Sequence, residues 1–124
     1  MQKHSGGGAK FSRFLSEELI PLIDRSYRTI PRRRSLMGHS YVGLFTAWTL
    51  LTETNGLFDR FLIVSPSLWY DERMIFSLEK KLERKLSGRV YLAVGSREGN
   101  AERDMVADLE RFASALRRHD ARSS

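Results

Sequence analysis

The residues with the clearest chemical potential lie in one turn of the chain, from Gly38 to Gly43. Ser40 stands in the middle of the turn, a short apolar strand over Ser35–Met37 leads into it, and an apolar helix follows at once. A sharp strand-to-helix turn lifts a serine Oγ above the sheet, and the helix N-terminus offers backbone N–H groups to an oxyanion. The pattern therefore makes Ser40 a candidate nucleophile and the N–H of Tyr41 a candidate oxyanion donor.

The match to the nucleophile turn Gly-x-Ser-x-Gly is incomplete. Gly38 takes the first glycine position, but Val42 stands where the second glycine belongs, and Gly43 follows one residue later. Serine is also a favoured N-cap of helices, so a plain capping role for Ser40 stays open at this point.

A catalytic serine needs a base to accept its proton, and that base is usually oriented by an acid. Glu98 follows the third predicted strand, where such an acid belongs in the order serine, acid, histidine, although a solvated loop glutamate would look the same. Asp71 and Asp104 are alternatives for the acid, but both are placed like residues that begin a helix.

The sequence offers three histidines for the base: His4, His39 and His119. His4 lies in a polar start, and His39 is the direct neighbour of Ser40, from which its side chain should point away. We predict His119 as the base, even though a last helix running antiparallel to the strands would carry it to the far end of the sheet. A partner subunit could then supply it.

Further candidates follow the second predicted strand, in the loop Ser65–Asp71. Trp69 and Tyr70 could form the wall of an acyl or aryl pocket, or simply pack on the sheet edge. With His39 they form the predicted substrate-binding set. Parallel sheets bind ligands beyond the carboxyl ends of their strands, so we expect this loop, the Ser40 turn and Gly95–Asn100 to share one rim.

Apolar periodicity predicts alternating helices and strands, joined by short links, in one domain over residues 9–119. A flexible segment 1–8 and a disordered tail 120–124 flank it. This order predicts an α/β fold of three layers, a short parallel sheet with helices on both faces. The predicted elements are a helix over Ala9–Tyr27 interrupted by Pro21, a strand over Arg33–Met37, a helix over Tyr41–Thr54, a strand over Phe61–Val64, a helix over Glu72–Leu86 capped by Asp71, a strand over Val90–Val94 and a helix over Ala101–His119.

Composition excludes several classes of protein. The 124 residues contain no cysteine, so disulfides and thiolate chemistry are excluded, and no segment matches a metal cluster or a cofactor fingerprint. No run of apolar residues is long enough for a membrane span or a signal peptide, from which we expect a cytoplasmic protein without membrane partners. The net charge of +6 is spread over predicted helix surfaces, so no nucleic-acid partner is expected.

Several motifs occur together and in order along the chain, at residues 6–21, 37–40, 43–45, 57–61, 65–71 and 94–99. Together they resemble the putative esterase family of α/β-hydrolases, the group that includes esterase D and the ferri-siderophore esterases. The resemblance implies an α/β-hydrolase fold, Ser40 as nucleophile, hydrolysis of carboxylic esters through an acyl-enzyme, and Glu98 as the matching acid. It also implies a truncated domain, because the family's N-terminal strands and its last strand, with the loop that bears the catalytic histidine, have no counterpart here.

We therefore predict a serine esterase that acts on short-chain carboxylic esters and needs no cofactor or metal. Three strands alone would leave two bare sheet edges, which pair readily, so we also expect a homo-oligomer. The alternative function is a non-catalytic remnant of a hydrolase that serves as an oligomerising interaction module.

Overall fold

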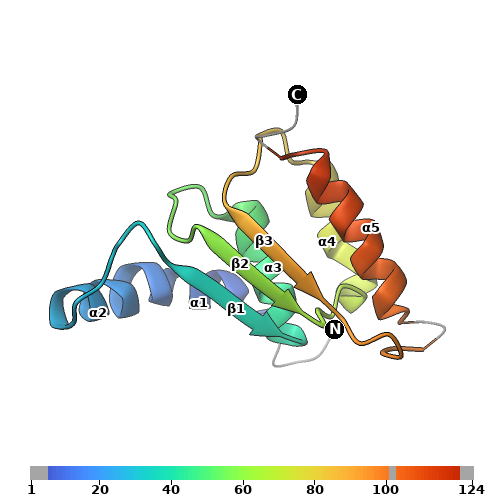
Figure 1. Ribbon diagram of the computed structural model, residues 1–124, viewed down its shortest axis with the longest axis horizontal. Coiled ribbons are helices and arrows are strands. Elements are labelled where there is room, and N and C mark those ends of the chain that lie inside the picture. Colours follow the sequence, from blue (N-terminus) through green and yellow to red (C-terminus); the bar gives the residue numbers. More distant parts are fainter. Residues whose placement is uncertain (1–5, 101–102, 121–124) are drawn as a thin grey trace.

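The computed structural model describes residues 6–100 and 103–120, and a sheet of three parallel strands forms its centre (Figure 1). The strands are β1 (Ser35–His39), β2 (Arg60–Val64) and β3 (Arg89–Ala93), in the spatial order β1-β2-β3. The register places Met37, Leu62 and Tyr91 side by side across the sheet. Because a helix joins each strand to the next, consecutive strands can run in the same direction.

The helical segments alternate with the strands as the apolar periodicity predicts. The α/β class and the short parallel sheet are confirmed. The helices are α1 (Gly8–Phe14), the π-helical segment η1 (Leu15–Leu19), α2 (Ile20–Ser26), α3 (Tyr41–Thr52), α4 (Tyr70–Lys80) and α5 (Met105–Arg117).

Only one face of the sheet is covered in the part of the chain that the structure describes. Phe61 and Ile63 of β2 point into the core and are 4% and 0% exposed, whereas Met37 and Tyr91 on the opposite face are 64% and 53% exposed. The expected second layer of helices is therefore not present among residues 6–100 and 103–120. The sequence of a short apolar strand such as Phe61–Val64 does not indicate whether helices will cover one face of the strand or both.

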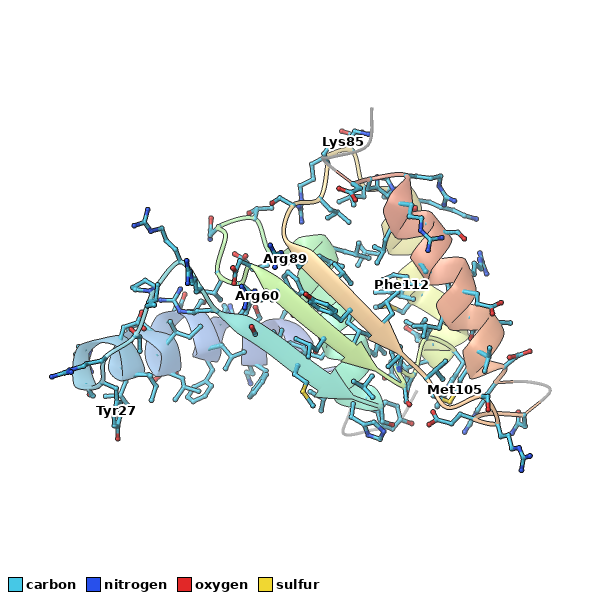
Figure 2. The ribbon with its side chains drawn as sticks, in the orientation of Figure 1. Tyr27, Arg60, Lys85, Arg89, Met105 and Phe112 are labelled. Atoms are coloured by element: carbon cyan, nitrogen blue, oxygen red, sulfur yellow. The ribbon has the colours of Figure 1, made fainter. Side chains whose placement is uncertain are left out.

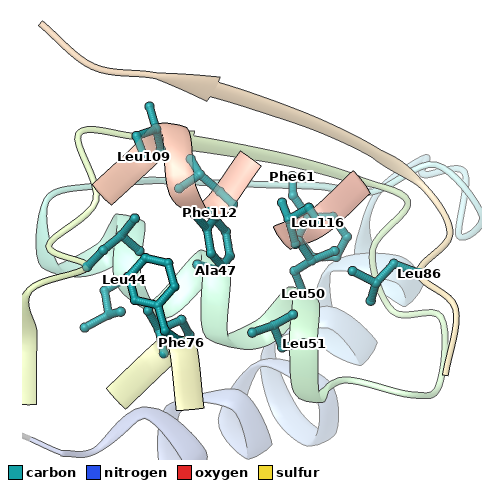
Figure 3. Packing of buried hydrophobic residues seen from close by; sticks show 13 residues of the cluster. Leu44, Ala47, Leu50, Leu51, Phe61, Phe76, Leu86, Leu109, Phe112 and Leu116 are labelled. Atoms are coloured by element: carbon teal, nitrogen blue, oxygen red, sulfur yellow. The ribbon is translucent and has the colours of Figure 1, made fainter. Parts of the chain in front are cut away.

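The core lies between this covered face and the helices α3, α4 and α5 (Figure 3). Helix α3 runs beneath β1 and β2 and is buried along most of its length, as its apolar sequence predicts. Phe112 of α5 is fully buried and meets Phe76 of α4 edge to face, with ring centroids 6.1 Å apart. Burial of one such side chain contributes about 1.5–3 kcal/mol to stability.

The helix predicted over Ala9–Tyr27 is present, but its middle turn is π-helical. This turn ends where α2 begins, one residue before Pro21. Proline has no backbone N–H, so the regular ladder of hydrogen bonds is interrupted there, and helices commonly adapt by a local change of winding. The interruption predicted at Pro21 therefore takes the form of a widened turn.

The helix predicted over Glu72–Leu86 begins earlier and ends earlier, as α4. Asp71 does not cap it, because Asp71, Glu72 and Arg73 have φ of 50°, 54° and 59° and the N-cap position falls on Trp69. This left-handed backbone is costly for residues with a Cβ, so the surrounding structure must hold it. Arg73 Nε donates to both carboxylate oxygens of Asp108, at 2.9 and 3.2 Å, and so connects this turn to α5.

The predicted boundaries at the two ends of the chain also change. Gly8 already belongs to α1, and residues 1–5 lie outside the described part of the chain. Helix α5 starts at Met105, capped by Asp104, whose carboxylate accepts the N–H of Ala107 at 3.0 Å. Asp120 forms a parallel bridge with Leu86 and so is part of the fold, while the predictions for residues 101–102 and 121–124 fall outside the described residues.

Candidate active site

The junction between β1 and α3 has the backbone of a strained turn, and Ser40 occupies it. Ser40 has φ 60° and ψ −118°, a conformation that costs roughly 1–3 kcal/mol for a residue other than glycine. Its own backbone holds it there. The N–H donates to the carbonyl of Val64 at 3.1 Å, and the carbonyl accepts the N–H groups of Leu44 and Ser67 at 3.0 and 3.1 Å. Ser40 is therefore not an ordinary N-cap, and its side chain makes no capping hydrogen bond.

Two glycines make the turn possible by letting backbones approach closely. A Cβ on Gly38 would lie 2.1 Å from the carbonyl oxygen of Val42 and 2.4 Å from Thr46 Oγ1. A Cβ on Gly43 would lie 2.9 Å from the carbonyl oxygen of Val64. Val42 itself is 53% exposed, so it does not crowd the turn, and Gly43 provides the close approach that the sequence pattern assigns to the preceding position.

The loop after β2 closes over Ser40 from the neighbouring strand. Ser67 is buried, and its Oγ lies 3.4 Å from Ser40 Oγ, where either hydroxyl can be the donor. Sequence reasoning did not identify Ser67 as a site residue, although its motif Ser65-Pro66-Ser67 follows directly on a strand that ends at the same rim. The third loop joins this rim too, because Ser65 N–H donates to the carbonyl of Ala93 at 2.7 Å. The predicted meeting of the three loops at one rim is thus observed.

The N-terminus of α3 presents backbone amides beside the Ser40 turn. The first N–H groups of a helix have no partner within the helix and lie at the positive end of its dipole. The N–H of Ser40 is excluded from this role because it is bonded to Val64, which leaves the amide of Tyr41 as the first one available by position.

An aromatic cluster stands beside the Ser40 turn. The ring of Tyr41 lies 5.9 Å from that of Trp69 and 5.8 Å from that of Tyr70, both edge to face. The guanidinium of Arg103, from the segment before α5, stacks over Trp69 at 3.9 Å. The structure therefore brings Trp69 and Tyr70 next to the Ser40 turn, and it adds Arg103, whose positive charge was its only signal in the sequence.

Glu98 lies in the third loop and folds back on it. Its N–H donates to the carbonyl of Gly95 at 3.1 Å, and its carboxylate lies against Gly95, 2.8 Å from the position of a Cβ there. No hydrogen bond joins Glu98 to Ser40 or His39 within the described residues. The structure keeps Glu98 at the predicted rim without bringing it to the serine.

The three histidines do not meet Ser40 in the described part of the chain. His39 ends β1 as an exposed residue, and His4 lies outside the described residues. His119 Nε2 lies 2.9 Å from Glu79 Oε1. The backbone carbonyl of His119 accepts the N–H of Leu86, which precedes β3. Because Ser40 follows β1 and all strands are parallel, His119 stands at the opposite end of the sheet, which rules it out as the base for Ser40 within one chain.

Two further observations limit the chemistry of the site. Among residues 6–100 and 103–120, no three His, Asp or Glu side chains gather in a way that could hold a metal ion. The same residues form no helix that is both long and apolar enough to cross a membrane.

A parallel sheet whose first strand turns through a strained serine into a buried helix defines an α/β-hydrolase. Comparison with known proteins makes this more specific: residues 2–123 match the family described as "Putative esterase". The chain belongs to this family.

The curated relatives of the chain are esterases of siderophores by name. It is 33% identical over 120 residues to the siderophore enterobactin esterase of Emericella nidulans, and 34% identical over 100 residues to the ferri-bacillibactin esterase BesA of Bacillus subtilis. The matches cover 86% and 75% of this chain, but only 38% and 34% of those proteins. The chain thus spans little more than a third of the curated relatives that it matches.

Solved structures also match this chain over only part of their own length. The BES protein of Bacillus cereus superposes with a TM-score of 0.81 at 28% identity, over 95% of this chain and 44% of that one. The siderophore hydrolase EstA of Aspergillus nidulans gives 0.80 at 25% identity, over 98% of this chain and 50% of that one. The chain therefore has the fold of about half of each of these two proteins.

Proposed function

We propose that this chain is the nucleophile-bearing part of a serine esterase that hydrolyses carboxylic esters through an acyl-enzyme at Ser40. The observation that carries the proposal is the backbone of Ser40, which is strained (φ 60°, ψ −118°) between β1 and the N-terminus of α3. A capping serine needs no such strain, whereas a nucleophile gains from it because its Oγ stands clear of the sheet.

In the proposed reaction Ser40 Oγ attacks the ester carbonyl carbon, and the Oγ proton passes to a base. The negative charge on the carbonyl oxygen is stabilised by backbone amides at the start of α3, including that of Tyr41. Collapse of the tetrahedral intermediate breaks the ester bond, and the alcohol leaves with a proton from the base. Water then attacks the acyl-serine and releases the carboxylic acid and Ser40.

The aromatic cluster and Arg103 support a choice of substrate. Trp69, Tyr70 and Tyr41 offer large apolar surfaces beside the serine, and Arg103 adds a positive charge stacked on Trp69. Such a wall suits an ester with an aromatic or anionic acyl group better than a simple short-chain ester. The relatives' names point to siderophore esters, and we extend that class to this chain, with short-chain esters as weaker substrates.

The base is the part of the mechanism that the described residues do not provide beside Ser40. Ser67 Oγ lies 3.4 Å away, but a hydroxyl is not basic at neutral pH, so it can only relay or orient the proton. We propose that a second copy of the chain supplies the base to Ser40, as the predicted homo-oligomer would allow. The predicted homo-oligomer and the expected cytoplasmic location stay predictions beside this proposal.

The placement of His119 favours a second candidate function, a non-catalytic hydrolase remnant that acts as an interaction module. With His119 bound to Glu79 at the far end of the sheet, Ser40 has no histidine partner among the described residues. The two candidates differ in whether Ser40 reacts at all.

One experiment separates them. Wild type and Ser40→Ala would be compared for hydrolysis of enterobactin and of p-nitrophenyl acetate and butyrate, and for labelling by a fluorophosphonate detected by mass spectrometry. We expect the wild type to be labelled at Ser40 and to hydrolyse the esters faster than the variant, with Ser114→Ala on the exposed side of α5 as the matched control. Equal rates in wild type and Ser40→Ala, with no label on Ser40, would refute the esterase and support the remnant.

A further inference from the structure

Ser67, in the loop after β2, carries a buried hydroxyl whose hydrogen-bond partner is the candidate nucleophile. The residue is 2% exposed, and its Oγ lies 3.4 Å from Ser40 Oγ. Within residues 6–100 and 103–120 this hydroxyl makes no other hydrogen bond. A buried hydroxyl is costly to leave unpaired, and the proton of Ser67 therefore has Ser40 Oγ as its acceptor.

The backbone of this loop fixes Ser67 without help from the hydroxyl. The N–H of Ser67 donates to the carbonyl of Ser40 at 3.1 Å, and the carbonyl of Ser67 accepts the N–H of Tyr70 at 3.1 Å. Pro66, which is fully buried, restricts the backbone one residue earlier through its ring. Because these contacts hold the loop, the side-chain hydroxyl is left for a role at Ser40 itself.

Gly43 of α3 allows the loop to come this close to Ser40. A Cβ on Gly43 would lie 3.0 Å from the Cα of Pro66, so a larger residue at this position would press the loop away from the helix. The glycine that stands one position later than in the nucleophile pattern is therefore in contact with the residue before Ser67. The displaced glycine and the contact between the two serines have the same structural origin.

The arginines at the start of the strands are too far away to act on Ser40. Figure 2 shows Arg60 and Arg89, the first residues of β2 and β3, at the end of the sheet opposite the rim, whereas Met105 lies near the carboxyl end of β3. Arg103 belongs to the rim, but its guanidinium is stacked on the aromatic cluster. Within the described part of the chain, the hydroxyl of Ser67 is thus the side-chain donor that is bonded to Ser40 Oγ.

We propose that Ser67 is a positioning residue for Ser40: its hydroxyl donates to Ser40 Oγ, directs the proton of Ser40 toward the base, and stabilises the negative charge that develops on Oγ as this proton leaves. The inference rests on the esterase function proposed above, and Ser67 keeps its own proton throughout the reaction.

The distance between the two hydroxyls fits this role. At 3.4 Å the hydrogen bond between two neutral hydroxyls is weak. A hydroxyl that donates to a charged oxygen approaches to about 2.5–2.7 Å and binds roughly twice as strongly. The bond therefore gains strength as charge develops on Ser40, and an interaction that is stronger in the transition state than in the ground state raises kcat and leaves KM unchanged.

The test measures kcat and KM of the full chain for p-nitrophenyl butyrate, together with labelling of Ser40 by a fluorophosphonate. Ser67→Ala should lower kcat at least about tenfold and leave KM within about twofold. A purely structural role would instead displace Trp69 and Tyr70, which follow in the same loop, and so raise KM. The matched control is Ser65→Ala, which removes a buried serine hydroxyl from the same loop, leaves the pair of Ser40 and Ser67 intact, and should keep kcat within about twofold.

A second pair of variants isolates the hydroxyl from any change of packing. Ser67→Thr and Ser67→Val add similar volume at the same buried position, but only threonine keeps the donor, so kcat of Ser67→Thr should exceed that of Ser67→Val at least about fivefold. Labelling of Ser40 in wild type, combined with equal kcat in wild type and Ser67→Ala or with equal kcat in the threonine and valine variants, would overturn the role of Ser67 and leave the esterase standing. Absence of any label on Ser40 in wild type would overturn both.

Discussion

His119 Nε2 lies 2.9 Å from Oε1 of Glu79, a residue in the last turn of α4 that is only 2% exposed. Arg118 Nη2 approaches the same oxygen at 3.1 Å. A buried carboxylate needs such donors, because an unpaired charge in the interior is costly. The C-terminal histidine of this chain thus joins the end of α5 to α4.

His119→Ala is expected to weaken the fold without affecting the reactivity of Ser40. Loss of the hydrogen bond to a charged, buried partner should lower the free energy of unfolding by about 1–2 kcal/mol, measured by guanidinium denaturation. Labelling of Ser40 by fluorophosphonate should proceed at the wild-type rate. Arg118→Ala is the matched control, and because that side chain is 63% exposed its effect should be smaller. Slower labelling in His119→Ala would contradict this structural role.

Gly38→Ala is expected to destabilise the chain strongly. The added methyl group would meet the backbone of α3 at 2.1 Å, and neither β1 nor α3 can move away without losing core contacts. We expect the free energy of unfolding to fall by about 3 kcal/mol or more. Gly7→Ala, where a Cβ would meet nothing within 4 Å, should change it by less than about 1 kcal/mol. Similar denaturation midpoints for the two variants would show that the turn is looser than described.

Val42→Gly restores the glycine of the nucleophile pattern and should bring no benefit. Val42 is exposed in the first turn of α3, so its replacement lowers helix propensity and should cost about 0.5 kcal/mol. Gly43→Ala should cost more, because its methyl group would press against the carbonyl of Val64 at 2.9 Å, which holds the N–H of Ser40. Fluorophosphonate labelling should therefore fall in Gly43→Ala and stay unchanged in Val42→Gly. Faster labelling in Val42→Gly would contradict the assignment of the close approach to Gly43.

The carboxylate of Asp24 predicts a contribution to acid stability. The hydrogen bond from Thr29 Oγ1, at 2.8 Å, and the ion pair with Arg34 lower the pKa of Asp24 below its ordinary value of 3.8. A lowered pKa in the folded state stabilises the fold above the unfolded pKa, and that stability is lost as the pH falls through the folded pKa. Asp24→Asn should therefore flatten the loss of stability below about pH 4, and NMR titration of Thr29→Val should show a higher pKa for Asp24. If the free energy of unfolding of Asp24→Asn fell with pH below about pH 4 as steeply as that of wild type, the contacts of Asp24 with Thr29 and Arg34 would not form in solution.

The order of strands and helices could be read from the sequence because it depends on local patterns. Apolar runs of four or five residues between breakers form β2 and β3, and Asp104 caps α5 through its own carboxylate. The boundaries of α4 could not be read in this way. They depend on three left-handed residues, the last of which, Arg73, is ion-paired with Asp108 of α5, 35 positions away.

Sequence alone determined that Ser40 lies between a strand and a helix with glycines nearby, because this arrangement depends only on residues that are consecutive in the chain. Only the tertiary structure decided which glycine makes the close approach, that Ser67 and Arg103 join the site, and that His119 is at the other end of the sheet. It also decided that one face of the sheet and the edge of β3 are left open. The physical reason is that these features depend on contacts between segments far apart in the chain, which no local preference of the residues can specify.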